Sequence, residues 1–103
     1  MPKRKLGILL STPPEDSNLA TAVALIEEAL KQDVQPYLYL LDEGVKNASE
    51  NKIEALYQKG LKLFLCAYGA QRYHIPISDK GVFGGLAVLS DLVKGCDRFI
   101  TLN

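Results

Sequence analysis

Residues 61–70 read LKLFLCAYGA, and they contain a change from strand to helix that recurs along the chain. An apolar run of strand length occupies residues 61–65, and Cys66 follows it directly. The small and aromatic residues after Cys66 predict a short helix that ends at about Tyr73. A nearly continuous apolar strand that gives way to a helix is typical of a parallel sheet covered on both faces.

The same alternation extends in both directions from this segment. The apolar spacing predicts further strands at residues 4–11, 35–41 and 98–102. It predicts longer helices at residues 17–32, at 49–59, and from Gly84 or Gly85 to Lys94. Strands that alternate with helices indicate βαβ units with right-handed crossovers. We therefore predict a three-layer α/β/α fold of flavodoxin-like architecture, with a mostly parallel sheet of about five strands, in one domain that spans residues 1–103.

The last third of the chain contains a predicted loop and an amphipathic helix. Pro76, Asp79 and Gly81 favour a loop at residues 74–83, with room for one short strand. In the helix that follows, the predicted buried face consists of Leu86, Leu89, Leu92 and Val93.

The composition excludes several classes of protein. Of the 103 residues, 48% are hydrophobic, and 12 basic residues balance 12 acidic residues, so the chain is neither disordered nor driven by bulk charge to nucleic acid or a membrane surface. Two cysteines are too few for the disulfide framework of a small secreted domain. We expect a reduced, cytoplasmic protein without a membrane span, which is small enough to gain stability by self-association.

Ligands of open α/β sheets bind beyond the carboxyl ends of the strands. Besides the segment at Cys66, two loops of this chain reach that edge. The residues predicted to line a strand-edge cleft there are Ser11, Thr12, Asp42, Glu43 and Gly44. The adjacent carboxylates favour a turn over an acid–base pair, and we expect Gly44 to supply the positive φ that such a turn uses.

Cys66 is the strongest nucleophile at this edge. It stands where a helix begins, and the free amides of a helix start favour the thiolate, which is the reactive form. Arg72 could add positive charge if its side chain folds back. The other reading is a buried structural cysteine, because free cysteine is among the most buried residue types.

Four segments, in order and spacing, resemble the DsrE/DsrF-like sulfur-relay family. They are the strand and helix at 6–30, the strand and acidic-Gly-Val turn at 39–45, CAYGAQR at 66–72, and the helix and Asp-Arg strand at 85–102. The resemblance implies a three-layer fold that assembles into trimers or hexamers. It also implies that Cys66 carries sulfur as a persulfide between a donor protein and an acceptor protein. The paired arginines of the family's cysteine segment are represented here by Arg72 alone.

Other residues have simpler readings. Cys96 precedes the last strand and should lie at the opposite edge of the sheet, too far from Cys66 for a disulfide. His74 could reach the thiol as base or cation, although a surface or interface position is favoured. Tyr68 and Tyr73 suit an apolar interface, because tyrosine is enriched there. One histidine and two separated cysteines predict no metal site. No GxGxxG or P-loop pattern follows the first strand, so no nucleotide site is expected.

The sequence therefore predicts a sulfur carrier or sulfurtransferase-type protein that acts through Cys66 and needs no cofactor. Tyr68, Gly69, Arg72 and His74 are the predicted supporting residues. The alternative is a non-catalytic assembly subunit, or a small-molecule-binding subunit, of the same fold with a structural Cys66.

Overall fold

The computed structural model describes residues 3–76 and 78–103. Its elements follow one another as β1 (Lys5–Leu10), α1 (Asn18–Lys31), β2 (Gln35–Leu40), the 3-10 helix η1 (Asp42–Ser49), α2 (Asn51–Gln58), β3 (Lys62–Cys66), α3 (Ala67–Arg72), β4 (Val82–Gly84), α4 (Leu86–Gly95) and β5 (Arg98–Leu102). β4 is the short strand for which the predicted loop at 74–83 left room. Residue 77 of that loop lies outside the described residues.

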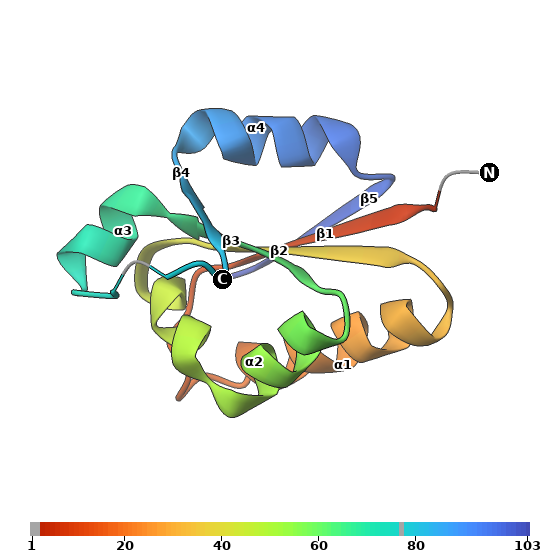
Figure 1. The fold of residues 1–103 in the computed structure, drawn as a ribbon, viewed down its shortest axis with the longest axis horizontal. Coiled ribbons are helices and arrows are strands. Elements are labelled where there is room, and N and C mark those ends of the chain that lie inside the picture. The colour runs from red at the N-terminus through yellow and green to blue at the C-terminus, as the bar shows by residue number, and fades with distance from the viewer. Residues whose placement is uncertain (1–2, 77) are drawn as a thin grey trace.

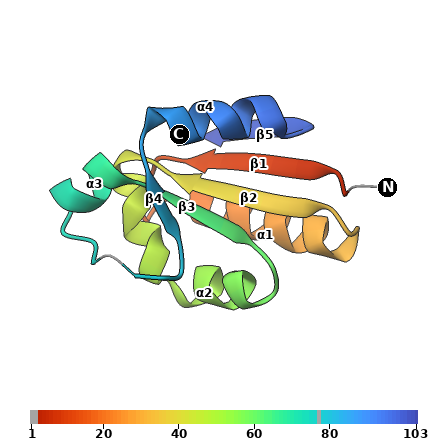
Figure 2. The ribbon, with the colours of Figure 1, turned by 45° about the horizontal axis from the view of Figure 1, so that its top comes forward.

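The strands form a five-stranded sheet in the order β4-β3-β2-β1-β5, and each neighbouring pair is parallel (Figure 2). The chain steps outward from β1 to β4 and then returns to place β5 on the far side of β1. Because right-handed crossovers in opposite directions lie on opposite faces of a sheet, the return helix α4 lies across the sheet from α1 and α2 (Figure 1). The predicted three-layer architecture and parallel sheet are confirmed.

The main core lies between the sheet and the α1–α2 layer. Alternate residues of three central strands point to this layer and are buried: Ile8, Leu10, Leu38, Leu40, Leu63 and Leu65. The helical spacing of α1 buries Ala22, Val23, Ile26 and Ala29 against them. This layer therefore supplies most of the buried apolar surface.

The opposite face of the sheet is more aromatic. It presents Tyr37 and Tyr39 from β2 and Phe64 from β3, and the rings of Tyr37 and Phe64 stack with centroids 6.2 Å apart. Gly7 makes room for a further ring, because a Cβ atom there would lie 2.5 Å from Cδ2 of Phe99. The alternation along the strands thus separates an aliphatic face from an aromatic one.

α4 covers the aromatic face only in part. No residue of α4 is buried, and the side chains of Leu86 and Val93 are 73% and 49% exposed. The predicted buried face is therefore wrong at these two residues. Val88, Leu89 and Leu92 make the contacts with the core instead, because they form the stripe of the helix that faces the sheet.

Candidate functional site

Cys66 occupies the junction that the sequence indicated. It is the last residue of β3 and the N-cap of α3, with φ −64° and ψ 120°. The amide of Gly69 donates a hydrogen bond to the Cys66 sulfur, with N and Sγ 3.5 Å apart. An N-cap side chain that accepts from the third helical residue satisfies a backbone donor that the helix leaves free. The residue is 9% exposed, so little of it is open to solvent.

The strand register brings a second polar side chain to this sulfur. Tyr39 of β2 pairs with Phe64 of β3, and Cys66 lies two residues further along the same strand. Residues two apart share a face, so Tyr39 and Cys66 are diagonal neighbours on the aromatic face. Cys66 in turn pairs with Gly84 of β4.

Tyr39 extends from the centre of the sheet into this corner, and it is fully buried. Its hydroxyl donates to the carbonyl oxygen of Gly84 at 3.2 Å and lies 3.4 Å from that of Gly85. Burial raises the pKa of Tyr39 to about 12, and the charge of Cys66 and its hydrogen bond with the hydroxyl add to the rise. The hydroxyl is therefore a neutral donor at physiological pH.

Tyr39 did not emerge from the sequence because it lies 27 positions before Cys66 and reads as one more apolar strand residue. The signal that could have found it is the register of the two strands. Once residues 35–41 and 61–66 are paired in parallel, a tyrosine at position 39 stands beside the cysteine.

The structure brings one of the four predicted supporting residues into contact with the sulfur, namely Gly69. Tyr68 stands next to it on the first turn of α3 and is 71% exposed. Arg72 is the last residue of this six-residue helix, about 9 Å along its axis from the cap, and His74 follows the end of the helix. The Arg72 guanidinium packs over the ring of Tyr73 at 5.4 Å and does not fold back.

The residues of the predicted strand-edge cleft do gather at one edge, but the space between them is filled. Asn47 of η1 is buried there, and its Nδ2 donates to the carbonyls of Thr12 and Gly44 at 2.9 Å each. The amide of Leu41 also donates to the carbonyl of Leu10 at 3.0 Å. This contact closes the edge around Ser11 and leaves Asp42 and Glu43 on the outside of η1.

The role expected of Gly44 in a turn is wrong. Asp42 takes the positive φ, at 55°, and residues 42–49 form a 3-10 helix. Gly44 is needed for a different reason, since a Cβ atom there would lie 1.9 Å from the carbonyl oxygen of Leu10. The glycine allows η1 to approach the end of β1.

Cys96 lies at the amino edge of the sheet, as expected. It ends α4 just before Asp97, whose amide donates to the carbonyl of Lys5 at the start of β1. Neither cysteine is in a disulfide. Burial raises the pKa of the Cys96 thiol, Asp97 adds to the rise and Lys5 opposes it. Cys96 is therefore an internal control for the reactivity of Cys66.

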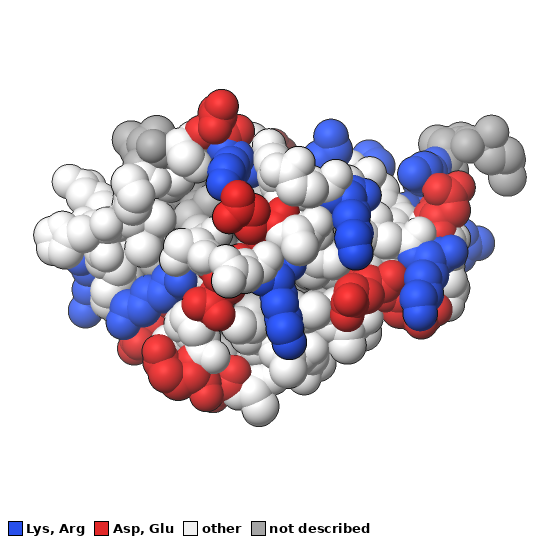
Figure 3. Space-filling model, turned by 60° about the horizontal axis from the view of Figure 1, so that its bottom comes forward, with Lys and Arg blue, Asp and Glu red and all other residues white. Residues whose placement is uncertain are grey.

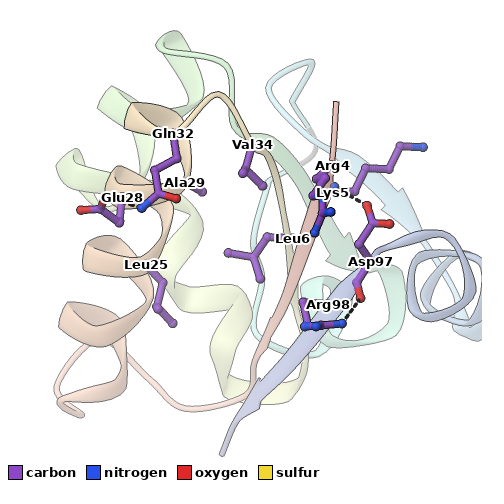
Figure 4. A pocket seen from close by; sticks show the side chains of 10 residues that line it. All are labelled: Arg4, Lys5, Leu6, Leu25, Glu28, Ala29, Gln32, Val34, Asp97 and Arg98. Atoms are coloured by element: carbon purple, nitrogen blue, oxygen red, sulfur yellow. Dashed lines mark hydrogen bonds between the residues drawn. The ribbon is translucent and has the colours of Figure 1, made fainter. Parts of the chain in front are cut away.

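Two hollows of the surface lie away from Cys66. A cleft of about 250 Å³ opens between α1 and the amino ends of β1 and β5, where Leu6 and Leu25 face one another (Figure 4). A polar hollow of about 450 Å³ lies between the loop after β1 and the start of α2, and is lined by Pro14, Glu50 and neighbouring residues. Neither is lined by Cys66 or by its contacts.

Two kinds of feature are absent from residues 3–76 and 78–103. No group of three or more His, Cys, Asp and Glu side chains is placed to hold a metal ion. No helix in this part of the chain is long and apolar enough to cross a membrane.

Comparison with known proteins gives this site a context. The profile of the DsrE/DsrF-like family matches residues 4–102. The chain belongs to the DsrE/DsrF-like family. Membership points, at the level of the family, to sulfur relay. No curated protein matches the sequence.

Solved structures agree with this membership in their fold. The ychN protein from E. coli superposes with a TM-score of 0.80 at 17% identity, and the match covers 96% of this chain and 99% of that one. A conserved protein of unknown function from Bacteroides thetaiotaomicron superposes with a TM-score of 0.72 at 14% identity, covering 95% of this chain and 94% of that one. At these identities the likeness shows a DsrE-like fold.

Proposed function

We propose that this chain is a small cytoplasmic sulfur carrier, which holds sulfur as a persulfide on Cys66 and passes it to a partner protein. The observation that carries the proposal is the position of Cys66 in a DsrE/DsrF-like chain. The cysteine ends a central strand, caps a helix and accepts a hydrogen bond from the amide of Gly69. Backbone amides at a helix start favour a sulfur anion, which is the form that attacks and the form that is stored.

The transfer is two thiol exchanges without net oxidation. The Cys66 thiolate attacks the outer sulfur of a donor persulfide, the donor's S–S bond breaks, and the donor leaves as a thiolate. The sulfur is then held as Cys66–S–S⁻. A thiolate of the acceptor attacks the outer sulfur, and Cys66 leaves as a thiolate again. Neither step requires a metal or an organic cofactor.

Access to the sulfur sets the kind of partner that fits. Cys66 is 9% exposed, whereas Tyr68 beside it on α3 is 71% exposed. A donor or acceptor cysteine on a flexible segment suits such a nearly buried thiol, while Tyr68 offers an aromatic surface for docking. We therefore propose that the donor and acceptor proteins contact α3.

The exposed side of α4 supports a proposal of self-association. The side chains of Leu86 and Val93 expose apolar surface on this helix. Val82 of β4, four residues before Leu86 in the chain, is 53% exposed. Only Asp91 and Lys94 among the ten residues of α4 carry charge. We propose that copies of the chain form a trimer or hexamer through this surface.

Sulfur loading tests the proposed function. The folded protein is incubated with a persulfide donor and its mass is measured; we expect a gain of one sulfur atom on Cys66. Cys66→Ser should abolish the gain, and the matched Cys96→Ser variant should retain it. If the wild type gains no sulfur from a donor that loads another carrier, the proposal is wrong.

The near-complete burial of Cys66 favours one alternative, a non-catalytic assembly subunit or small-molecule-binding subunit with a structural thiol. That alternative predicts that Cys66 is alkylated more slowly than Cys96 in the folded protein at neutral pH. The sulfur-carrier proposal predicts the reverse, because Cys96 has a raised pKa and stays protonated.

A further inference from the structure

The hydroxyl of Tyr39 is the side-chain donor that the fold delivers to Cys66. Three adjacent parallel strands build the corner: Tyr39 on β2, Cys66 on β3 and Gly84 on β4. The hydroxyl donates to the carbonyl of Gly84, which is the register partner of Cys66, and the same register makes Tyr39 a diagonal neighbour of Cys66 on one face of the sheet. The hydroxyl therefore has a fixed acceptor in the Gly84 carbonyl, and the neighbouring sulfur is an acceptor whose charge changes.

A buried hydroxyl between two acceptors donates its hydrogen bond to the acceptor with the larger negative charge. When Cys66 is a neutral thiol, the Gly84 carbonyl is the stronger acceptor. When the sulfur is an anion, a bond to it is charge-assisted and about twice as strong as a neutral one. A rotation about the C–O bond of the phenol moves the proton between the two acceptors while the ring stays in place.

We propose that Tyr39 is a positioning residue for Cys66, whose hydroxyl turns from the Gly84 carbonyl to the sulfur when the sulfur becomes an anion. For the thiolate this role requires only the contact on β2 and β3. For the persulfide anion it rests on the proposed function. In both states the hydroxyl and the Gly69 amide approach the sulfur from different elements and together replace the water that burial removes.

The surroundings leave Cys66 as the ionisable group that faces Tyr39. The nearest residues of the same face on β1 and β3 are Leu9 and Phe64. α4 turns Val88, Leu89 and Leu92 toward the core, and the charged side chains of Asp91 and Lys94 are exposed. The end of β4 and the N-cap of α4 contribute the carbonyls of Gly84 and Gly85.

The main test compares two tyrosines of one strand. Tyr39→Phe removes the hydroxyl and keeps the ring, and Tyr37→Phe makes the same change two residues earlier on the same face. The alkylation rate of Cys66 by iodoacetamide is measured between pH 5 and pH 10, with each cysteine identified by mass. We expect the midpoint of the profile to rise by about one pH unit in Tyr39→Phe and to stay unchanged in Tyr37→Phe.

A reciprocal measurement does not depend on the folding of Tyr39→Phe. The tyrosines of the wild type and of Cys66→Ala are titrated by ultraviolet absorbance. Loss of the sulfur should lower the pKa of Tyr39 from about 12, because the charge of Cys66 and its hydrogen bond both contribute to the rise. An unchanged tyrosine titration in Cys66→Ala would overturn the proposal.

Sulfur loading in the same variants separates this inference from the proposed function. If the wild type loads sulfur on Cys66 and Tyr39→Phe keeps both the alkylation midpoint and the lifetime of the persulfide, the role of Tyr39 is wrong and the sulfur carrier stands. If the wild type loads no sulfur but the midpoint still rises in Tyr39→Phe, the sulfur carrier is wrong and the contact with the thiol stands. A midpoint that moves equally in Tyr37→Phe also contradicts the role of Tyr39.

Discussion

The two faces of the sheet differ in how completely helices cover them. α1 and α2 lie side by side on one face and bury Ile26 and Ile53 completely, whereas α4 alone lies on the other and has no buried residue. A helix with its side chains is about 10 Å wide and strands are about 4.8 Å apart, so one helix covers roughly two strands of the five. The face with one helix must therefore leave apolar surface open.

The surface chemistry follows the same division. On the side of α1 and α2, Lys and Arg side chains are interspersed with Asp and Glu, as suits a face in contact with water (Figure 3). α4 instead exposes Leu86 and Val93. The well-covered face therefore contains most of the core, while the sparsely covered face holds Tyr39 and Cys66 and is the side on which we expect partners.

Truncation of a core residue should have the largest effect on stability. Ile26→Ala removes a fully buried side chain of α1 and should lower the free energy of unfolding by about 3 kcal/mol. Val93→Ala on α4 is the matched change at a half-exposed side chain and should cost less than about 1 kcal/mol. Urea denaturation measures both. Equal losses of unfolding free energy in the two variants would mean that the two faces contribute equally to stability.

High pH should lower the stability of the fold, because Tyr39 ionises beneath α4. The pKa of Tyr39 in the fold, about 12, lies above its ordinary value of 10.0. Its contribution to stability is therefore complete below pH 10 and is lost as the pH rises through 12, because the unfolded chain releases the proton first. Denaturation midpoints measured from pH 8 to pH 12 should fall less steeply in Tyr39→Phe than in the wild type. Tyr37→Phe is the control and should follow the wild type.

A charge on the exposed side of α4 should change stability least and association most. Leu86 is 73% exposed, so Leu86→Asp should alter the free energy of unfolding of the monomer by less than about 0.5 kcal/mol. In an oligomer joined through α4, the same charge would be buried without a partner and should dissociate the assembly. Sedimentation velocity distinguishes the two states. An assembly that survives Leu86→Asp would place the interface elsewhere.

The sequence predicted correctly those features that depend on a single strand or helix. The apolar run at 61–65 followed by Cys66 predicted the end of β3 and the start of α3, and the spacing along residues 17–32 predicted the buried stripe of α1. It failed at α4, since helical periodicity shows which residues share a face but not how much of that face a neighbour covers.

The candidate site divides in the same way. Local sequence determined Cys66 and Gly69, because a cap and its amide lie three residues apart in one helix start. Sequence proximity suggested Arg72, whose guanidinium packs over the ring of Tyr73 at the far end of α3. Only the parallel register of β2, β3 and β4 decided that Tyr39 and Cys66 are neighbours on one face of the sheet. The physical reason is that a strand's own pattern specifies which face a side chain takes, whereas its neighbour across the sheet depends on how separate segments pair.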